Sequence, residues 1–359
     1  MKRSLPIASA SRIAVAETVP PRPPGWGDAP GGLVDARGRA MSYLRVSITD
    51  RCDMACVYCM PPGGEDEHAS REDVLSFEEL VRITRALATG GVRRLRLTGG
   101  EPLVRKDVVR LVERLRGAID AELAMTTNAS RLAVLARPLR DAGLDQVNVS
   151  IDSLDRARFA EITRGGDLGE VLAGIRAALD VGLEVKTNTV ALGGVNDDEL
   201  GAIVDWAWAL GVSPRFIELM PIGEGASLPS ARFLGAHDIV ARLGDRVRSE
   251  KTAAAPHRGP ARYLRAADGS SRTVGLITAV TDEFCDGCNR VRLTSRGDLR
   301  ACLASRRAVS LRDVLRAGGD ERDVLWATAW SLGAKDAGHR FGDRLEDEHE
   351  HVGMSLIGG

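Results

Sequence analysis

The feature that most constrains this chain is an alternation, from Tyr43 onward, between short apolar or β-branched runs and longer stretches of helical periodicity. Six such units occur, and the pattern predicts parallel strands joined by helices. In an α/β sheet or barrel, the loops at the carboxyl ends of the strands carry the active site. The predicted strands cover residues 44–49, 93–98, 122–127, 146–150, 184–190 and 215–218.

Local signals predict where several helices begin and end. Ser76 and Glu79 form a capping box at the start of one helix. A second helix is expected over residues 196–210, and a helical stretch over residues 311–332. Pro138 is expected to interrupt the helix that follows the third strand, because proline lacks the backbone N–H that a helix interior needs.

The chain is predicted to fall into three parts. Residues 1–40 lack a sustained apolar core, and residues 19–32 are rich in proline and glycine, so we expect a disordered N-terminal extension over residues 1–40. Residues 41–250 contain the six strand–helix units. Residues 253–260 have the composition of a linker, and residues 251–359 are expected to form a smaller C-terminal domain.

Charge and composition narrow the class of partner. The chain has 49 basic and 50 acidic residues, which gives no electrostatic reason to expect nucleic acid or a membrane surface as partner. It has no apolar run of transmembrane length, and its six cysteines favour a reducing compartment, so we expect a cytoplasmic protein with a small-molecule substrate. Only five basic residues are lysines, so a lysine inside a predicted strand, Lys186, is more informative than an arginine.

Three cysteines follow the first predicted strand: Cys52, Cys56 and Cys59 form C-x3-C-x2-C. Three thiols on one short loop indicate a metal centre. A structural zinc site needs four ligands, usually with paired C-x2-C cysteines, and only His68 is near enough in sequence to be the fourth. A [4Fe–4S] cluster held by three thiolates keeps one iron open. Zinc, or simple burial of the cysteines, is the alternative.

With Tyr58 before its last cysteine, this motif resembles the signature of the radical S-adenosylmethionine (SAM) enzymes. The resemblance implies a [4Fe–4S] cluster whose open iron chelates SAM. It continues at residues 99–102, Gly-Gly-Glu-Pro, where Gly100 corresponds to a SAM contact; an ordinary tight turn is the alternative. Ser150 and Met220 match further SAM-contacting positions, although Met220 by itself has the character of a core residue.

A second trio lies near the C-terminus: Cys285, Cys288 and Cys302 form C-x2-C-x13-C. Zinc is a stronger alternative here, because C-x2-C is its common half-site. However, the six cysteines divide three and three, which leaves no fourth thiol. Arg290 and Arg292 follow Cys288 directly and suit a polyanion beside a metal. A second [4Fe–4S] cluster is therefore expected.

From Tyr43 to Gly359 the chain resembles the GTP 3′,8-cyclase family of molybdenum cofactor biosynthesis. The resemblance implies a partial (βα)6 TIM-like barrel with a C-terminal iron–sulfur domain, and a second cluster whose open iron binds the guanine of GTP. It implies GTP contacts at six positions: Arg45, Arg96, Thr126, Lys186, Arg290 and Arg292. A cation within a strand is also costly to bury unless an anion pairs with it, although a structural ion pair is an equal alternative for each arginine.

The same resemblance implies several further features. The terminal Gly358 and Gly359 match a family tail that reaches into the active site, with plain terminal disorder as the alternative. Ala129 stands where the family usually has glycine. The implied partners are a one-electron donor such as flavodoxin or ferredoxin and, functionally, cyclic pyranopterin monophosphate synthase. No acid–base residue is assigned, and the oligomeric state stays open, a homodimer included.

Two other functions compete with this hypothesis. A radical SAM peptide-maturation enzyme also carries an auxiliary cluster in its C-terminal domain, but that domain usually has more than three cysteines. An iron–sulfur electron carrier or a zinc-stabilised binding module would leave the Gly-Gly-Glu-Pro loop and the cations of the strands unexplained.

Overall fold

The structure is a computed structural model that describes residues 17–26, 32–63, 68–252, 259–305, 307–339, 341 and 354. Its strands form one 12-stranded sheet in the order β12-β11-β10-β1-β2-β3-β4-β5-β6-β9-β8-β7. The strands are β1 (Tyr43–Ser47), β2 (Arg94–Thr98), β3 (Glu122–Thr127), β4 (Gln146–Ser150), β5 (Glu184–Ala191), β6 (Ser213–Glu218), β7 (Val247–Thr252), β8 (Arg262–Ala266), β9 (Thr273–Ile277), β10 (Arg290–Leu293), β11 (Asp298–Arg300) and β12 (Val309–Ser310).

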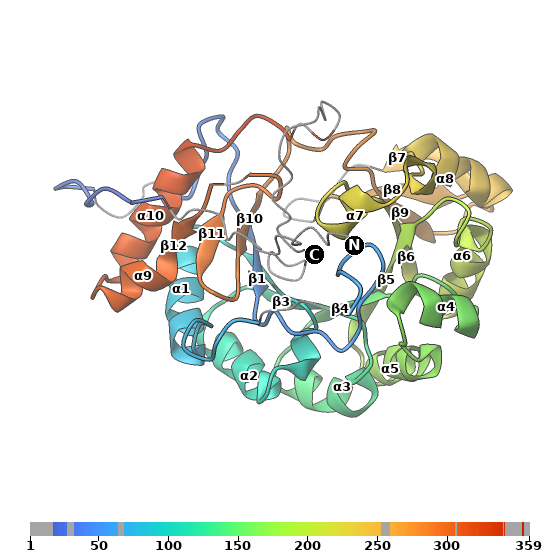
Figure 1. Ribbon diagram of the computed structural model, residues 1–359, viewed down its shortest axis with the longest axis horizontal. Helices are drawn as coiled ribbons and strands as arrows, with labels where there is room; N and C mark the ends of the chain where they lie inside the picture. The colour runs from blue at the N-terminus through green and yellow to red at the C-terminus, as the bar shows by residue number, and fades with distance from the viewer. Residues whose placement is uncertain are drawn as a thin grey trace, which may run out of the picture.

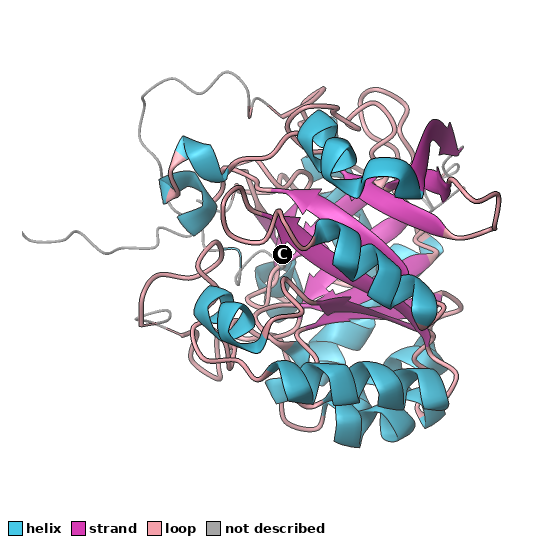
Figure 2. Cartoon of the chain, turned by 90° about the vertical axis from the view of Figure 1, so that its right-hand side faces the viewer, coloured by secondary structure: helices cyan, strands magenta, loops and turns pink. Residues whose placement is uncertain are grey.

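Helices cover the outer face of this curved sheet, as Figures 1 and 2 show. They are α1 (Phe77–Thr89), α2 (Val108–Ala118), α3 (Leu132–Asp141), α4 (Arg156–Thr163), α5 (Leu168–Asp180), α6 (Leu200–Ala209), α7 (Glu224–Ser227), α8 (Ala236–Leu243), α9 (Leu311–Arg316) and α10 (Glu321–Gly333), with short 3-10 turns η1 (Pro102–Val104), η2 (Ser230–Arg232) and η3 (Gly244–Arg246). Within the described part of the chain, none of the helices combines the length and the apolar character that a bilayer crossing requires.

Strands β1 to β6 run parallel and in sequence order, so the predicted α/β fold is confirmed and each predicted strand is found within two residues of its expected ends. Alternation within the strands explains the two faces of the sheet. In β1, Leu44 and Val46 are fully buried in the core beneath the helices, whereas Tyr43 and Arg45 line an internal cavity. Residues of one strand alternate between faces, so the apolar positions build the core and the polar positions between them build a chamber.

The C-terminal segment extends the same sheet at both edges. β9 pairs in parallel with β6 and carries the antiparallel strands β8 and β7, while β10 pairs in parallel with β1 and carries β11 and β12. Strands from the C-terminal segment therefore flank both edges of the six-strand parallel core, β9 beside β6 and β10 beside β1. The predicted boundary between residues 250 and 251 falls inside β7, and the division into 41–250 and 251–359 stays a prediction.

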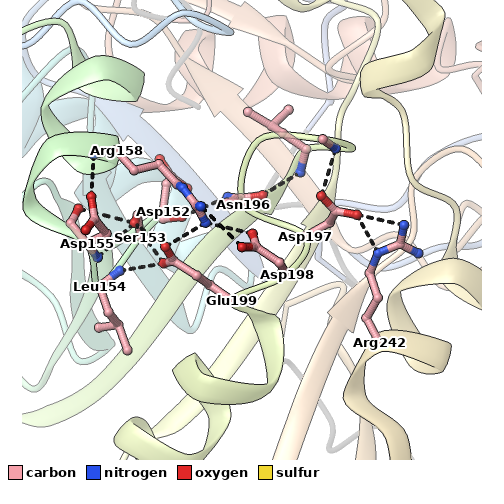
Figure 3. A network of polar contacts seen from close by, with 12 residues as sticks. Asp152, Ser153, Leu154, Asp155, Arg158, Asn196, Asp197, Asp198, Glu199 and Arg242 are labelled. Atoms are coloured by element: carbon pink, nitrogen blue, oxygen red, sulfur yellow. Dashed lines mark hydrogen bonds and ion pairs between the residues drawn. The ribbon is translucent and has the colours of Figure 1, made fainter.

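The capping box before α1 is confirmed, since Ser76 Oγ accepts from Glu79 N and the Glu79 carboxylate accepts from Ser76 N. The helix expected over residues 196–210 begins only at Leu200. Figure 3 shows the reason: the Asn196 amide donates to the Asp152 carbonyl at 2.8 Å, and Glu199 accepts from Ser153 Oγ at 2.8 Å. These side chains join the loop after β5 to the loop after β4 and do not cap a helix turn.

Two other helix predictions were wrong in detail. α3 continues through Pro138, because the carbonyl that loses its donor belongs to Val134, a residue that is 76% exposed and can bind water instead. The stretch 311–332 is two helices, since Gly318, with a φ of +91°, ends α9 and Asp320 caps α10.

The sequence predicts disorder over residues 1–40, whereas the described parts of this stretch pack on the protein. Glu17 N donates to the Ala308 carbonyl at 2.7 Å, and Trp26 meets Trp326 of α10 edge to face at 5.2 Å. Leu33 is 2% exposed in the core. Apolar side chains within a proline- and glycine-rich stretch explain the packing, because each buried side chain favours an ordered backbone.

Candidate active site

The first cysteine trio lies on the loop between β1 and α1. Backbone N–H groups of Cys59 and Met60 both donate to the Cys56 carbonyl, at 2.9 and 3.0 Å, which winds the loop into a tight turn. The loop is also tied to the end of α4, because Val57 N donates to the Ile162 carbonyl at 2.9 Å. This turn and its anchor direct Cys52, Cys56 and Cys59 toward one cavity.

The Gly-Gly-Glu-Pro loop after β2 lies directly against the chain that enters this turn. A Cβ on Gly99 would stand 2.2 Å from the Thr49 carbonyl oxygen, and one on Gly100 would stand 2.3 Å from the Arg51 carbonyl oxygen. Gly100 N and Glu101 N donate to those same two carbonyls, at 2.9 and 2.8 Å. Only glycine permits such an approach, so the loop and the cysteine turn form one rigid unit.

Every residue predicted on the SAM side lines this first cavity: Cys52, Cys56, Tyr58, Cys59, Gly100, Ser150 and Met220. The Tyr58 hydroxyl donates to the Asp152 carboxylate at 2.6 Å, and Val190 N donates to the same carboxylate at 2.9 Å. Burial raises the pKa of Asp152 to about 6 and raises the pKa of Tyr58. Asn196 in turn donates to the backbone carbonyl of Asp152, so the residue that accepts from the Tyr58 hydroxyl is itself held in place.

The second trio lines a neighbouring cavity, together with all the residues predicted on the GTP side: Cys285, Cys288, Cys302, Arg45, Arg96, Thr126, Lys186, Arg290 and Arg292. Strand register explains how distant residues meet there. Arg45 of β1 pairs with Arg96 of β2 on one side and with Arg292 of β10 on the other. Three guanidinium groups therefore leave the sheet side by side toward the same space.

The two cavities share part of their wall, namely Thr126, Asn188, Ile217, Met220 and Met354. Both cysteine trios consequently face one chamber, made of these two adjoining cavities on the inner face of the curved sheet. A chain whose trios opened onto separate surfaces could not act as a two-cluster enzyme on a single substrate. Gly358 and Gly359 lie outside the described residues, whereas Met354, from the same tail, lies at the junction of the two cavities.

The spacing of the cysteines also bears on the metal. Zinc–sulfur bonds of about 2.3 Å in a tetrahedral site bring the sulfurs to within roughly 3.8 Å of one another. Among the described residues, neither trio has all its sulfurs within 4.8 Å of one another; the set that meets this limit is Glu283, Cys285 and His339. Neither trio by itself therefore has the close sulfur spacing of a zinc site.

Two protein families match the chain over nearly all of this architecture. The Radical SAM superfamily matches residues 46–207, and the family Molybdenum Cofactor Synthesis C matches residues 212–341. The chain is 43% identical over 341 residues to the GTP 3′,8-cyclase of Rhizobium meliloti (strain 1021). The matched stretch covers 91% of this chain and 94% of that protein. The chain belongs to the GTP 3′,8-cyclase family. Membership of the radical SAM superfamily implies SAM and a [4Fe–4S] cluster.

Two more GTP 3′,8-cyclases match the chain to a similar extent. Those of Rhodopseudomonas palustris (strain TIE-1) and Paracoccus denitrificans (strain Pd 1222) are 45% and 44% identical, over 94% and 88% of this chain and 98% and 91% of theirs. The fold is similar to that of Streptococcus suis SuiB bound to the precursor peptide SuiA, with a TM-score of 0.56 at 15% identity, over 77% of this chain and 64% of that one. At that identity the likeness shows the fold alone.

Sequence reasoning missed several polar side chains of the GTP 3′,8-cyclase chamber, among them Tyr43, Arg94 and Arg215, which also line the second cavity. A signal for two of them was present, because Tyr43 and Arg94 stand two positions before Arg45 and Arg96 and so share their face of the strand. Arg215 has a partner in the fold: a Cβ on Gly275, its neighbour in β9, would lie 2.5 Å from Arg215 Cγ.

The electrostatics of this cavity are strongly one-sided. Seven cations line it, and no aspartate or glutamate of the described chain does; the cations are Arg45, Arg94, Arg96, Lys186, Arg215, Arg290 and Arg292. Burial, with repulsion from neighbouring guanidinium groups, lowers the pKa values of Arg45 and Arg215 to about 10. Burial would raise the pKa of Tyr43, but the charges of Arg96, Arg45 and Arg94 outweigh it and lower that pKa to about 7.

Hydrogen-bond acceptors and one carboxylate of the protein stabilise some of these cations. The Arg96 guanidinium donates to the Met125 carbonyl at 3.1 Å and to the Gln146 side chain at 2.9 Å, which holds it in place. Lys186 Nζ lies 2.8 Å from the half-exposed Glu184 carboxylate. By contrast, Nε and Nη2 of Arg215 are buried and make no hydrogen bond to any residue that the structure describes. Such a site suits a ligand with several negative charges.

Proposed function

We propose that this chain converts GTP to (8S)-3′,8-cyclo-7,8-dihydroguanosine 5′-triphosphate, the first step of molybdenum cofactor biosynthesis. Its relatives of 43–45% identity carry the name of that activity. The observation that carries the proposal is the chamber, in which the second trio shares its cavity with seven cations and that cavity shares a wall with the cavity of the first trio. A polyanionic substrate anchored beside the second trio would therefore adjoin the cavity that the first trio faces.

On the SAM side, Cys52, Cys56 and Cys59 would bind a [4Fe–4S] cluster and leave one iron for the amino and carboxylate groups of SAM. Gly100 presents its backbone to the same cavity, because the close approach of the loop to the cysteine turn excludes any side chain there. We assign Tyr58, Ser150 and Met220 to further SAM contacts, in line with the family resemblance and their place in the cavity wall.

On the substrate side, Cys285, Cys288 and Cys302 would bind a second [4Fe–4S] cluster whose open iron receives the guanine. We assign the triphosphate and ribose to the predicted contacts Arg45, Arg96, Thr126, Lys186, Arg290 and Arg292, and we add Tyr43, Arg94 and Arg215. Multiple guanidinium groups suit this role, since each can donate two parallel hydrogen bonds to phosphate oxygens.

Held by these residues, the first cluster and SAM would supply the 5′-deoxyadenosyl radical chemistry that links the ribose 3′ position to C8 of guanine. The contribution of the chain is position and shielding. The cations would fix the triphosphate in the second cavity, which shares a wall with the first. Ile217, Met220 and Met354 make that wall largely apolar, which excludes water from the radical. No side chain is assigned as a general acid or base.

The decisive experiment uses anaerobically purified protein. Iron and sulfide analysis should give about eight irons per chain for two clusters. With SAM and a reductant, 5′-deoxyadenosine should form only when GTP is added. GTP carrying deuterium at ribose C3′ should pass that deuterium to 5′-deoxyadenosine, and GTP deuterated at C8 should not.

Other outcomes identify the competing functions. Stoichiometric zinc without iron would indicate a binding module. Iron-loaded protein that forms 5′-deoxyadenosine equally with and without GTP would favour peptide maturation or another substrate. A protein with two clusters that transfers electrons but never cleaves SAM would be an electron carrier.

The wider setting is proposed on the same basis. None of the six cysteines is paired in a disulfide, which suits a reducing compartment such as the cytoplasm. A one-electron donor such as flavodoxin or ferredoxin must reduce the first cluster. The product would pass to cyclic pyranopterin monophosphate synthase. The oligomeric state stays open, a homodimer included.

A further inference from the structure

Lys335 follows the C-terminal end of α10 and is buried, with 7% of its surface exposed. Its Nζ lies 3.0 Å from the Arg290 carbonyl oxygen, 3.7 Å from Cys288 Sγ and 3.4 Å from Met41 Sδ. Within the described chain, no carboxylate lies within ion-pair distance of this ammonium group. Lys335 is one of five lysines in the sequence, so a buried lysine here is unusual for the chain.

The backbone around Lys335 is fixed by a second cation. Arg39 donates to the carbonyls of Asp336 and Ala337, at 2.8 and 2.9 Å, and to the carbonyl of Cys285 at 2.7 Å. Asp35 holds Arg39 in turn through an ion pair of 2.5 Å. One arginine therefore joins the segment after α10 to the loop of the second trio, and the place of Lys335 beside Cys288 is set by this frame.

The burial of an ammonium group is unfavourable by several kcal/mol unless a negative charge compensates it. The carbonyl and the thioether near Lys335 are neutral, which leaves the Cys288 sulfur as the group that can carry the compensating charge. A thiolate bound to iron carries that charge, and N–H groups that donate to cluster sulfurs are a recognised means of setting a cluster potential. The position of Lys335 thus suits a second trio that holds an iron–sulfur cluster.

We infer that Lys335 is a positioning residue of the second cluster, whose ammonium group donates to the Cys288 sulfur, retains the cluster and raises its reduction potential. This inference rests on the proposed function, because it requires an iron–sulfur cluster at the second trio.

Arg290 donates to the same sulfur at 3.7 Å but differs in its place. Its side chain lines the cavity and is available to phosphate, whereas Lys335 approaches the trio from the core side and does not line either cavity. A substrate can therefore draw Arg290 away from Cys288 and leave Lys335 in contact. Lys335 provides the donor that persists when GTP is bound.

The test isolates the second cluster within the full-length chain by the substitutions Cys52→Ala, Cys56→Ala and Cys59→Ala. In this parent, Lys335→Met removes the charge and retains an apolar side chain. At the midpoint potential of the parent, anaerobic titration followed by electron paramagnetic resonance should show the ratio of reduced to oxidised cluster lowered about tenfold, a shift of about 59 mV to more negative potential. Lys335→Arg should restore the parent value. Lys106→Met, which removes an exposed lysine, should leave it unchanged.

An unchanged potential in Lys335→Met at full iron content would overturn the inference. If Lys335→Met fails to retain iron, Lys335→Gln and Lys335→Arg decide the matter: a parent-like potential in the arginine variant and a lowered one in the glutamine variant supports the inference, and equal potentials overturn it. A parent that binds zinc or no metal at the second trio would instead refute the proposed function, and the inference with it.

Discussion

Replacement of Arg215 by methionine should stabilise the protein in the absence of GTP and weaken its affinity for GTP. Arg215 is 8% exposed, and two of its nitrogens make no hydrogen bond to a described residue. Its pKa is lowered to about 10, first by burial and then by the charges of Arg96 and Arg94. The folded protein thus holds a cation that its own surroundings disfavour.

The magnitude follows from the lowered pKa. A decrease from the ordinary arginine value to about 10 means that the charge is less favourable in the folded than in the unfolded chain by roughly 3 kcal/mol. Because the folded pKa is the lower one, this penalty is fully present at every pH below about 10. Methionine removes the charge and keeps part of the aliphatic stem, so we expect a net gain of roughly 1–3 kcal/mol and a thermal midpoint a few degrees higher.

GTP binding should respond in the opposite direction. A charged hydrogen bond contributes roughly 1.5–3 kcal/mol, so its loss should raise the Kd for GTP about 10- to 100-fold. Calorimetric titration and thermal unfolding, both on anaerobic protein with its clusters, measure the two effects. Arg110→Met, which removes an exposed arginine of α2, is the matched control and should alter neither. An Arg215→Met protein that is less stable without GTP, or that binds GTP as tightly as the wild type, would refute the reasoning.

Two further predictions test other parts of the chamber. Gly100→Ala places a methyl group 2.3 Å from the Arg51 carbonyl oxygen and should abolish SAM binding and halve the iron content, whereas Gly117→Ala, which meets nothing within 4 Å, should keep both; equal iron in the two variants would contradict this. Tyr43→Phe should be increasingly less stable than wild type as the pH rises above about 7, by about 4 kcal/mol near pH 10, because a phenol with a lowered pKa contributes stability that is lost as the pH falls through about 7. A difference in thermal midpoint that does not change between pH 6 and 9.5 would contradict it.

Local sequence signals predicted the core of the fold well. The six parallel strands were found within two residues of their expected ends because each is a short apolar run between turn residues, a pattern that depends on few distant contacts. Ser76 and Glu79 predicted a helix start for the same reason, since a capping box is complete within four residues. The rule that active-site loops follow parallel strands also located the first trio and the Gly-Gly-Glu-Pro loop, which directly follow β1 and β2.

Features that depend on distant contacts could not be predicted in this way. Nothing local to β9 or β10 indicates that one pairs with β6 and the other with β1. Asn196 is a residue type that often begins a helix, but its side-chain amide instead donates to the Asp152 carbonyl of another loop. The inward side chain of Arg215 depends on the glycine opposite it in β9, and that pairing is itself non-local.

The pairing of β10 with β1 explains why the substrate cations and the second trio cannot be separated. In parallel register, Arg290 and Arg292 stand opposite Tyr43 and Arg45, so the chain that precedes β10, with Cys288, must enter at the same end of the sheet as β1. β1 leaves the sheet at its opposite end, where the first trio follows. One trio thus precedes a strand and the other follows its neighbour, and the cations along both strands occupy the space between them. On the proposed function, a triphosphate bound to these cations would therefore lie between the two cysteine trios because of backbone register alone, before any side chain selects the base.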